Sequence, residues 1–396
     1  MTVERTDVLV IGGGVLGCAT AYHLARRGRD VLVVERGQSN REASGASAGT
    51  LHVQMPGPYF RAHYDQGVSV GDRARLAATD QLYAEAARRW RTLEAVLGAD
   101  LGVRFHGGLM VAETAEGLAA LERKSRLERP FGIRTEILGV PDLRAMAPGL
   151  SARLAGAAYC AEEGFANPLL VAPAYLRAAS SLGARYRLDT RVDAIESRAG
   201  GGFVVHTPPG RIGAGRIVCA AGAQTGAIAA MVGLDLPVQP HPLQVMVTER
   251  CAPVLAPLVQ HGERRLSLRQ TPHGTFVIGG GWPALTGDAT GPSAPMAGSI
   301  TGSARVAVDV LPCLQRLRLV RAWAAMTTAT SPGNRVGIIG QSGRAPGFFV
   351  LVSSGWGFTL SPVLGEVAAE LASDAVPSLP VEAFEPERCV GEGRGR

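Results

Sequence analysis

Short runs of apolar residues alternate along this chain with segments of helical period. The first run, 8–11, is β-branched and too short for a buried helix, so we predict a central parallel strand there. A helix is predicted over 15–27, ended by Gly28, and a second apolar strand over 31–34. A strand, a helix and a second strand in this order predict a parallel βαβ unit at the start of an α/β fold.

Apolar residues three and four apart predict further helices. These are expected over 80–97, over 115–128 and from Asn167 to Gly183. A last helix is expected over 363–373, with Ser361 as its N-cap and Pro362 at its first position.

Alternation of apolar and polar residues predicts strands in the second half of the chain. Segments 243–248 and 275–279 are expected in antiparallel sheet, and 266–270 should pair with the latter across a turn. Further strands are expected at 184–188, 191–195, 203–207, 216–219 and 348–353. The Gly-, Pro- and Ser-rich segment 287–296 is expected to be a surface loop.

Composition and charge narrow the class of protein. The chain has 396 residues, 46% hydrophobic and 19% charged, which is typical of a globular protein with two lobes. The net charge is +6, yet the basic residues are scattered arginines, and Lys124 is the only lysine. Because no basic run with interleaved aromatics occurs, nucleic acid is not an expected partner. An attraction for anionic substrates such as carboxylates is the milder interpretation.

The six cysteines form no C-x-x-C pair, which favours buried thiols in a reducing compartment over a disulfide framework or a metal site. The first apolar run is the predicted strand itself, so no cleavable signal is expected. No apolar stretch is long enough for a transmembrane segment. A cytoplasmic location is therefore expected.

A glycine-rich turn follows the first strand. Gly12, Gly14 and Gly17 have the G-x-G-x-x-G spacing, which allows a tight turn, close approach of a pyrophosphate and close helix packing. Glu35 ends the second strand roughly 20 residues later, where a carboxylate accepts from an adenosine ribose. The complete unit predicts dinucleotide binding, against the alternative of a glycine turn without a ligand.

Four blocks of sequence resemble the FAD-dependent amine and amino-acid oxidoreductases, the family of D-amino-acid, glycine and sarcosine oxidases. They are Ile11-Gly-Gly-Gly-Val-Leu-Gly with Glu35-Arg36, Ala43-Ser-Gly-Ala-Ser-Ala-Gly-Thr, Ile217-Val-Cys-Ala-Ala-Gly-Ala and Ser353-Ser-Gly-Trp-Gly-Phe-Thr-Leu-Ser-Pro. Leu51-His-Val-Gln and Ser267-Leu-Arg-Gln-Thr are most similar to the flavin subunits of opine oxidase, hydrogen cyanide synthase and D-hydroxyproline dehydrogenase.

The resemblance implies a glutathione-reductase-like FAD-binding domain and an antiparallel-sheet substrate domain. We place the first in segments 1–80, 141–225 and 335–396, and the second in 81–140 and 226–334. It also implies noncovalent FAD, since no cysteine lies in the segment where some relatives tether the flavin. The cofactor residues that it implies are Gly12, Gly14, Val15, Leu16, Glu35, Arg36, Ser44, Ala48, Gly49, Thr50, Val192, Ala221, Gly222, Gly355, Trp356, Gly357, Phe358, Thr359 and Leu360.

The chain departs from the family at the substrate position. Thr327 stands where many relatives carry an arginine that clamps the substrate carboxylate, and threonine cannot form that fork. Arg269 is our first candidate for a substitute cation and Arg61 the second. His52 follows the loop expected to contact the flavin, so it either polarises the ring or accepts a proton, or is a structural hydrogen-bonding histidine. Lys124 lies outside the segment where sarcosine oxidases place a lysine over the flavin, which favours a dehydrogenase over an oxidase.

The implied activity is oxidation of a C–N bond in an amino acid, imino acid or related secondary amine, with hydride transfer to flavin N5 and formation of an imine. The alternatives are a tailoring oxidase of a secondary metabolite and a non-catalytic FAD-binding subunit of a heteromeric dehydrogenase. Oxygen or a partner redox subunit would accept the electrons. Both homo- and hetero-oligomers stay open.

Overall fold

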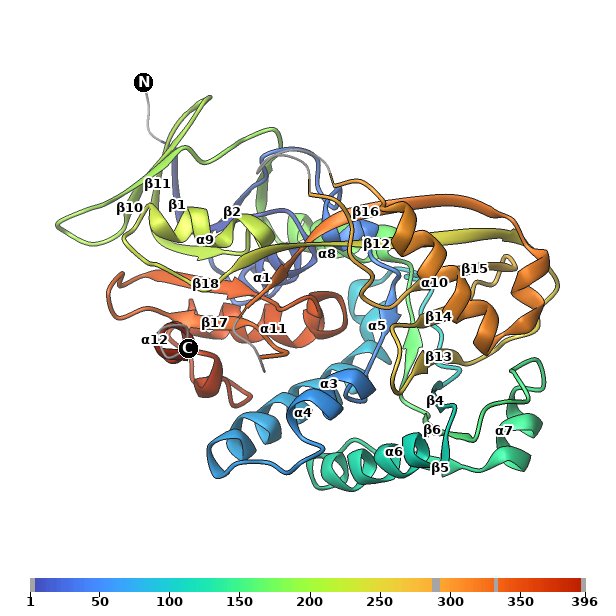
Figure 1. The fold of residues 1–396 in the computed structure, drawn as a ribbon. Helices are drawn as coiled ribbons and strands as arrows, with labels where there is room; N and C mark the ends of the chain where they lie inside the picture. The colour runs from blue at the N-terminus through green and yellow to red at the C-terminus, as the bar shows by residue number, and fades with distance from the viewer. Residues whose placement is uncertain (1–3, 287–292, 331–333, 393–396) are drawn as a thin grey trace.

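Two eight-stranded sheets form the framework of the protein in the computed structural model, which describes residues 4–286, 293–330 and 334–392. The first sheet lies beside helices α1 and α11, and the second carries α10 (Figure 1). The helices are α1 (Val15–Arg26), α2 (Ala43–Ala46), α3 (Gly57–His63), α4 (Val70–Trp90), α5 (Leu93–Leu97), α6 (Ala115–Glu128), α7 (Val140–Met146), α8 (Pro168–Ser181), α9 (Thr225–Ala230), α10 (Ala297–Val310), α11 (Gly357–Leu371) and α12 (Pro386–Glu392).

The first sheet is built around the N-terminal strand. Its path is β17 (Ile338–Gln341), β18 (Phe348–Val352), β11 (Gly210–Cys219), β1 (Glu4–Ile11), β2 (Val31–Val34) and β8 (Arg185–Arg187), while β10 (Phe203–Thr207) joins β11 and β9 (Ala194–Ser197) joins β10. β1 is parallel to both β2 and β11, and its residues 8–11 are buried. Helices α8 and α11 pack against α1. The predicted parallel βαβ unit is therefore confirmed.

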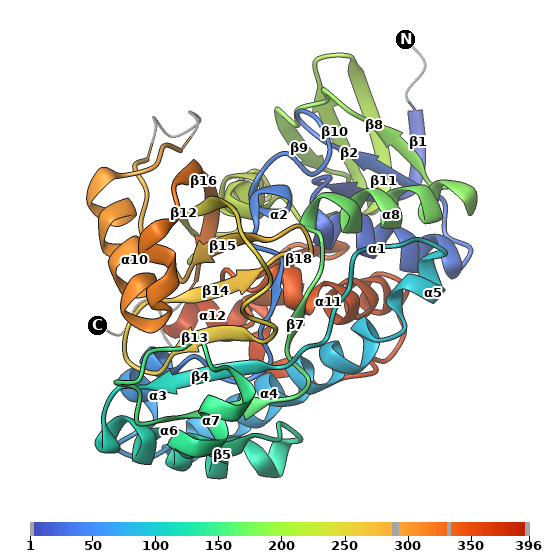
Figure 2. The same cartoon turned by 90° about the vertical axis from the view of Figure 1, so that its right-hand side faces the viewer.

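The second sheet is mostly antiparallel. Its order is β16 (Leu319–Ala329), β12 (Gln239–Arg250), β15 (Thr275–Gly279), β14 (Ser267–Gln270), β13 (Leu258–His261), β4 (Gly108–Ala112), β6 (Gly156–Cys160) and β5 (Glu136–Leu138). Figure 2 shows β15, β14, β13 and β4 side by side. A separate antiparallel pair is formed by β3 (Thr50–Leu51) and β7 (Gly164–Phe165). The predicted pairing of β14 with β15 is confirmed.

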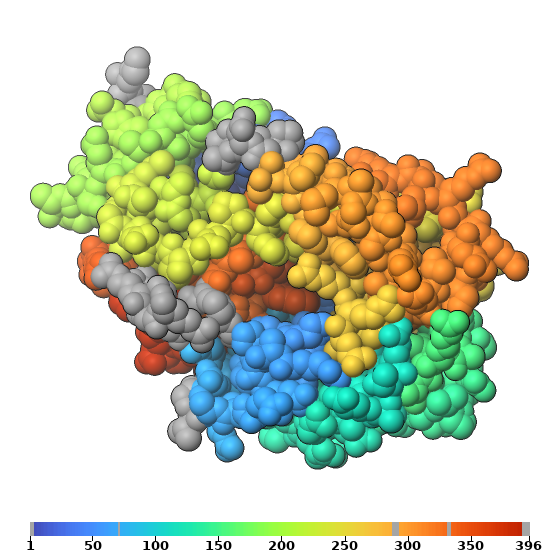
Figure 3. Space-filling view, viewed as in Figure 1, coloured from blue at the N-terminus to red at the C-terminus, as the bar shows by residue number. Residues whose placement is uncertain are grey.

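In the space-filling view, the gold residues of the second sheet's segments lie beside the blue surface formed by α3 and α4 (Figure 3). The strand β6 belongs to a segment that we assigned to the FAD-binding domain, and it pairs in the second sheet. Those domain boundaries stay a prediction.

The helix predicted over 80–97 differs in both its start and its continuity. It begins earlier, as α4, where Ser69 Oγ accepts a hydrogen bond from Asp72 N at 3.1 Å. It breaks after Trp90, because the amides of Arg91 and Thr92 turn back to carbonyls three residues earlier, and α5 follows. Periodicity alone did not reveal this break, since the apolar spacing continues across it.

The start predicted for the last helix is wrong. α11 begins at Gly357, after Trp356 as N-cap, so Pro362 lies inside the helix. A proline there cannot donate to the carbonyl four residues earlier, that of Phe358. The Ser361 hydroxyl donates to this carbonyl instead, at 2.9 Å. Ser361 is therefore a substitute donor within the helix.

Part of the predicted loop 287–296 lies outside the described residues; 293–296 are described, and Ala294 bridges to Leu285.

All six cysteines are free thiols, of which Cys313 is exposed and Cys251 half-buried, contrary to the expectation that all are buried. Among the described helices, none combines the length and apolar character needed to cross a bilayer.

Candidate active site

A cavity of about 1180 Å³ extends from the glycine-rich turn after β1 to the strands β12, β14 and β16 of the second sheet. Its walls include the loop after β2, the start of α11 and the segment after β15. The same cavity therefore connects the predicted dinucleotide site to the predicted substrate domain.

The glycine-rich turn is so compact that a side chain at Gly12 or Gly17 would collide with the backbone. Gly12 has a φ of 115°, and a Cβ there would lie 2.4 Å from the carbonyl oxygen of Ala220. A Cβ on Gly17 would lie 2.0 Å from the carbonyl oxygen of Gly12. These two glycines fix the approach of α1 to the strands β1 and β11, as the motif predicts.

Gly14 has a different environment. A Cβ at this position would meet a single atom within 4 Å, Ser44 Oγ at 3.2 Å, so its exposed side faces the cavity. Ser44 Oγ accepts a hydrogen bond from Val15 N at 3.0 Å, which fixes α2 against the first turn of α1. The open backbone at a helix N-terminus suits a pyrophosphate.

Glu35 lines the same end of the cavity. Its carboxylate accepts hydrogen bonds from Gly13 N at 2.7 Å and from Gly37 N at 3.0 Å. A carboxylate has about four acceptor sites, so each oxygen retains capacity for a ribose hydroxyl. The adjacent Arg36 is paired with Glu42 at 3.1 Å. The backbone thus orients Glu35 without exhausting its acceptors.

The residues predicted to bind the cofactor lie along this cavity, with two exceptions. Gly49 and Leu360 do not contribute to the walls. Leu360 is fully buried in the core beneath α11, and a Cβ on Gly49 would meet the carbonyl oxygen of Ala166 at 2.2 Å. Those that line it are Gly12, Gly14, Val15, Leu16, Glu35, Arg36, Ser44, Ala48, Thr50, Val192, Ala221, Gly222, Gly355, Trp356, Gly357, Phe358 and Thr359.

His52 also lines the cavity. Its Nε2 is 3.2 Å from Ser267 Oγ, and its ring packs edge-on against Trp356 with centroids 5.6 Å apart. Burial lowers the pKa of His52 to about 3, so the ring is neutral at physiological pH. The Nδ1 atom has no hydrogen-bond partner among the described residues.

Arg269 and Arg61 do not line the cavity, whereas Thr327 does. Arg269 is buried, its Nε donates to the carbonyl of Ala48 at 2.8 Å, and its guanidinium lies 4.7 Å from the ring centre of Phe165. Arg61 pairs with Glu263 at 3.0 Å. In this structure, Arg269 therefore supports the flavin-side loop. A substrate contact for either arginine stays a prediction.

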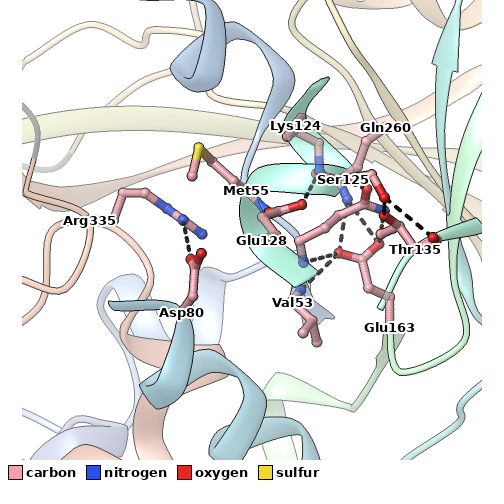
Figure 4. A network of polar contacts seen from close by, with 11 residues as sticks. Val53, Met55, Asp80, Lys124, Ser125, Glu128, Thr135, Glu163, Gln260 and Arg335 are labelled. Atoms are coloured by element: carbon pink, nitrogen blue, oxygen red, sulfur yellow. Dashed lines mark hydrogen bonds and ion pairs between the residues drawn. The ribbon is translucent and has the colours of Figure 1, made fainter. Parts of the chain in front are cut away.

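A buried polar network that the sequence did not reveal joins the residues that follow His52 to Glu163 and Gln260 (Figure 4). Glu163 Oε1 accepts from Val53 N at 2.8 Å and from Gln54 N at 3.1 Å. Its carboxylate also accepts from the side-chain amides of Gln54 and Gln260, at 3.1 and 3.0 Å. Gln260 lines the cavity. Glu163 thus holds the chain after His52 against β13. In the sequence, the one indication that Glu163 is buried is its position between the apolar segments of β6 and β7.

Lys124 continues the network and is fully buried. Its Nζ is 2.7 Å from Glu128 Oε2 and 3.2 Å from Gln54 Oε1, while Glu128 also accepts from Met55 N. Beside this pair, Arg335 and Asp80 form a second buried ion pair at 3.4 Å. Lys124 does not line the cavity.

The network should make stability depend on pH through Glu163. Burial raises the pKa of Glu163 to about 7 from its ordinary value near 4.5, although three N–H groups of Val53 and Gln54 and the positive charge of Lys124 oppose the shift. A raised folded-state pKa contributes stability that is fully present below the unfolded pKa and is lost as pH rises through 7. Between pH 5 and 8, this effect should lower the unfolding free energy of the wild type by about 2 kcal/mol, and Glu163→Gln should lack that decline. Denaturant unfolding at each pH measures it.

The neighbouring Glu162→Gln provides a matched control, because Glu162 is half-exposed. Its stability profile should follow the wild type. Parallel profiles for Glu163→Gln and the wild type would contradict the assignment.

Unpartnered polar atoms on the cavity walls fit a bound polar ligand. Among the described residues, His52 Nδ1, Gln244 Nε2 and Ser353 Oγ are buried without a hydrogen-bond partner, and all three residues line the cavity. Buried polar groups are usually satisfied, so such atoms indicate a ligand or water in this space. Together with the open backbone at Gly14, they fit FAD and a small substrate.

Comparisons with known proteins agree with this geometry. Residues 7–371 match the model of a family described as "FAD dependent oxidoreductase". The chain is 29% identical to a subunit of opine oxidase from Agrobacterium tumefaciens (strain Ach5), over 98% of this chain and 100% of the relative. Glycine oxidase from Geobacillus kaustophilus has a similar crystal structure, with a TM-score of 0.83 and 25% identity over 97% and 99% of the two chains. L-proline dehydrogenase from P. horikoshii has a TM-score of 0.86 at 22% identity, over 100% of both chains, which shows a shared fold.

Proposed function

Since the chain belongs to the family of FAD-dependent oxidoreductases, we propose that it oxidises the C–N bond of an amino acid, imino acid or related secondary amine. The observation that carries the proposal is the continuous cavity that extends from the glycine-rich turn to the sheet around Thr327. The names of the relatives, an opine oxidase subunit and a glycine oxidase, support the same class of substrate.

In the proposed reaction the amine carbon loses a hydride and its nitrogen lone pair forms the C=N bond, which water then hydrolyses. When bound, FAD would supply the hydride acceptor. Gly12, Gly14 and Glu35 would hold its dinucleotide portion. The backbone amides at the start of α11 would stabilise negative charge at the pyrimidine end, because a helix N-terminus is electropositive. The protein mainly orients the amine and excludes water.

An anaerobic screen of amino acids, N-methyl amino acids and opines tests the proposal. Loss of the visible flavin band on addition of one of these compounds is the expected result. A holoprotein whose flavin stays oxidised with every class would contradict it and would favour the non-catalytic subunit.

His52 is proposed to position the ring system rather than to serve as the general base. A residue whose pKa is near 3 holds almost no proton at neutral pH and is a weak base. We expect His52→Gln to slow anaerobic flavin reduction by less than about tenfold, below the hundredfold or more that loss of a general base costs. Stopped-flow absorbance measures the rate constant, and a drop beyond a hundredfold would assign His52 the catalytic role instead.

We also propose a cytoplasmic location, which the six free thiols support, and either oxygen or a partner redox subunit as the electron acceptor. The similarity to a protein that is itself one subunit of an opine oxidase supports a heteromeric assembly. Reoxidation of the reduced flavin by air within seconds would favour oxygen. Co-purification of a second redox subunit would favour the heteromer.

A further inference from the structure

The buried network in Figure 4 has more carboxylates than cations. Its charged side chains, none more than 3% exposed, are Asp80, Lys124, Glu128, Glu163 and Arg335. Lys124 pairs with Glu128 at 2.7 Å. Arg335 pairs with Asp80 at 3.4 Å. Glu163 forms no ion pair with any cation in the part of the chain that the structure describes. Two cations therefore face three carboxylates, and the negative charge in excess belongs to Glu163.

Glu163 is also shielded from water. A Cβ on Gly108 of β4 would lie 2.0 Å from Glu163 Oε2, so this strand packs directly against the carboxylate. The groups that contact its oxygens are N–H donors of Val53, Gln54 and Gln260. A buried anion without a cation is costly even when it is hydrogen-bonded. Burial raises the pKa of Glu163 to about 7, so a change in nearby charge decides whether it holds a proton.

The carboxylate lies close to the cavity. Its partner Gln260 lines the cavity and pairs in register with Ser267. Ser267 Oγ is 3.2 Å from His52 Nε2, and the His52 ring packs against Trp356 at the start of α11. The proposed function places the pyrimidine end of the flavin at this start. One side chain, Gln260, therefore separates the Glu163 carboxylate from the space in which reduction would add negative charge.

The two side-chain amides bonded to Glu163 differ in their freedom to turn. Lys124 Nζ, which can only donate, is 3.2 Å from Gln54 Oε1, so the Gln54 oxygen is fixed toward the lysine. Gln260 Nε2 lies 3.0 and 3.2 Å from the two Glu163 oxygens, and its side chain has no other hydrogen bond among the described residues. Rotation of the Gln260 amide would present its oxygen to a protonated Glu163. The site can therefore accommodate a proton without backbone movement.

The other titratable groups around the network do not change charge near pH 7. Burial raises the pKa values of the tyrosine and cysteine side chains there, and burial lowers the pKa of His52 to about 3. Burial raises the pKa of Asp80 too, but the charge of Arg335 beside it opposes the shift. By element, the groups are Tyr59 and Tyr64 of α3, Asp80 and Tyr83 of α4, Lys124 and Glu128 of α6, Cys160 of β6 with Glu162 after it, His52 after β3, and Arg335 before β17.

Resting on the proposed function, we propose that Glu163 takes up one proton when a hydride is delivered to FAD. A protonated amine that becomes a protonated imine releases one hydride from carbon and one proton from nitrogen. The hydride adds one negative charge to the ring system, and the proton converts the Glu163 carboxylate into a neutral carboxyl group. Two unit charges roughly 10 Å apart in a protein change each other's proton affinity about tenfold. When the reductant is not an amine, the solvent supplies the proton.

The test measures the midpoint potential of the bound flavin against pH, in reductive titrations with a redox dye and without any amine. Glu163→Gln is neutral at every pH. Near pH 5 the wild-type potential should therefore run parallel to that of Glu163→Gln. Above pH 7 it should fall relative to the variant by about 30 mV in total, which is a tenfold change in proton affinity for a two-electron couple. Glu162→Gln, at the half-exposed neighbouring position, should follow the wild type.

Infrared difference spectra provide a second readout. Reduction of the wild type at pH 8 should produce the C=O band of a protonated carboxyl group, and Glu163→Gln should lack this band. Parallel potentials for the wild type and Glu163→Gln at all pH values, or loss of the pH-dependent fall in Glu162→Gln as well, would overturn the inference.

Flavin content and the melting temperature identify a folding defect in Glu163→Gln, and Glu128→Gln then provides an independent test. This change leaves the charge of Lys124 without its partner, which favours the ionised form of Glu163, so the fall in potential should begin at a lower pH. A fall at the wild-type pH would place the proton outside the network and overturn the inference. A holoprotein that no amine reduces but that shows the fall would contradict the proposed function and leave this inference standing.

Discussion

Replacing Lys124 with methionine is expected to lower the free energy of unfolding by about 3–5 kcal/mol, because it leaves the buried carboxylate of Glu128 without its cation. Both side chains are fully buried, and their charged atoms are 2.7 Å apart. Lys124→Met also removes the donor to Gln54, whose side-chain amide connects the pair to Glu163. Denaturant unfolding of the purified variant, followed by tryptophan fluorescence, measures the loss.

A double variant separates the uncompensated charge from the lost packing volume. Lys124→Met combined with Glu128→Gln removes both charges at similar volume, so it should recover more than half of the stability lost in the single variant. The side-chain amide of glutamine can still accept from Met55 N. If the double variant is less stable than Lys124→Met alone, the pair acts through shape and hydrogen bonding, and the electrostatic explanation is wrong.

Local features of the sequence predicted the dinucleotide-binding part of the fold because each acts over a few residues. The glycines at 12 and 17 are needed wherever a strand turns into a closely packed helix, and the Cβ distances show the collisions that any other residue would cause. The βαβ unit, the helix α6 and the pairing of β14 with β15 follow from periodicity and turn residues in the same way.

Contacts between distant segments could not be predicted from those features. Glu163 comes from a turn between β6 and β7, yet it accepts hydrogen bonds from the chain after His52 and from Gln260 on β13. Its partners are about one hundred residues away in either direction, and no spacing rule connects them. The sequence contains a single lysine, but its burial against Glu128 depends on this tertiary network.

The arginines of the segment around β14 illustrate the same limit. Arg265, Ser267 and Arg269 alternate along one segment, so a strand pattern places them on one side. Arg269 is drawn to the carbonyl of Ala48 and the ring of Phe165, whereas Arg265 stays on the cavity wall. Only the three-dimensional partners distinguish an arginine that supports a loop from one that is available to a ligand.

Replacing Gly14 with alanine is expected to weaken FAD binding at least about tenfold, or ~1.4 kcal/mol, and to leave the apoprotein folded. The backbone there, with φ −77° and ψ 178°, is open to any residue, and the new methyl group would meet only Ser44 Oγ, at 3.2 Å. The methyl group would instead occupy the space in which a pyrophosphate approaches the backbone. Reconstitution of the apoprotein with FAD, followed by flavin fluorescence, measures the affinity.

Gly17→Ala provides the contrast that makes the experiment specific. Its Cβ would lie 2.0 Å from the carbonyl oxygen of Gly12, so this variant should lose thermal stability in the apoprotein itself, before any flavin is added. When both proteins lack FAD, the free energy of unfolding of Gly14→Ala should instead lie within about 1 kcal/mol of the wild-type value. The stabilities of the two proteins should differ further only when FAD is present. Because a ligand that binds only the folded state stabilises it, this divergence reports the cofactor site directly. Unchanged FAD affinity in Gly14→Ala would show that the pyrophosphate does not approach this turn.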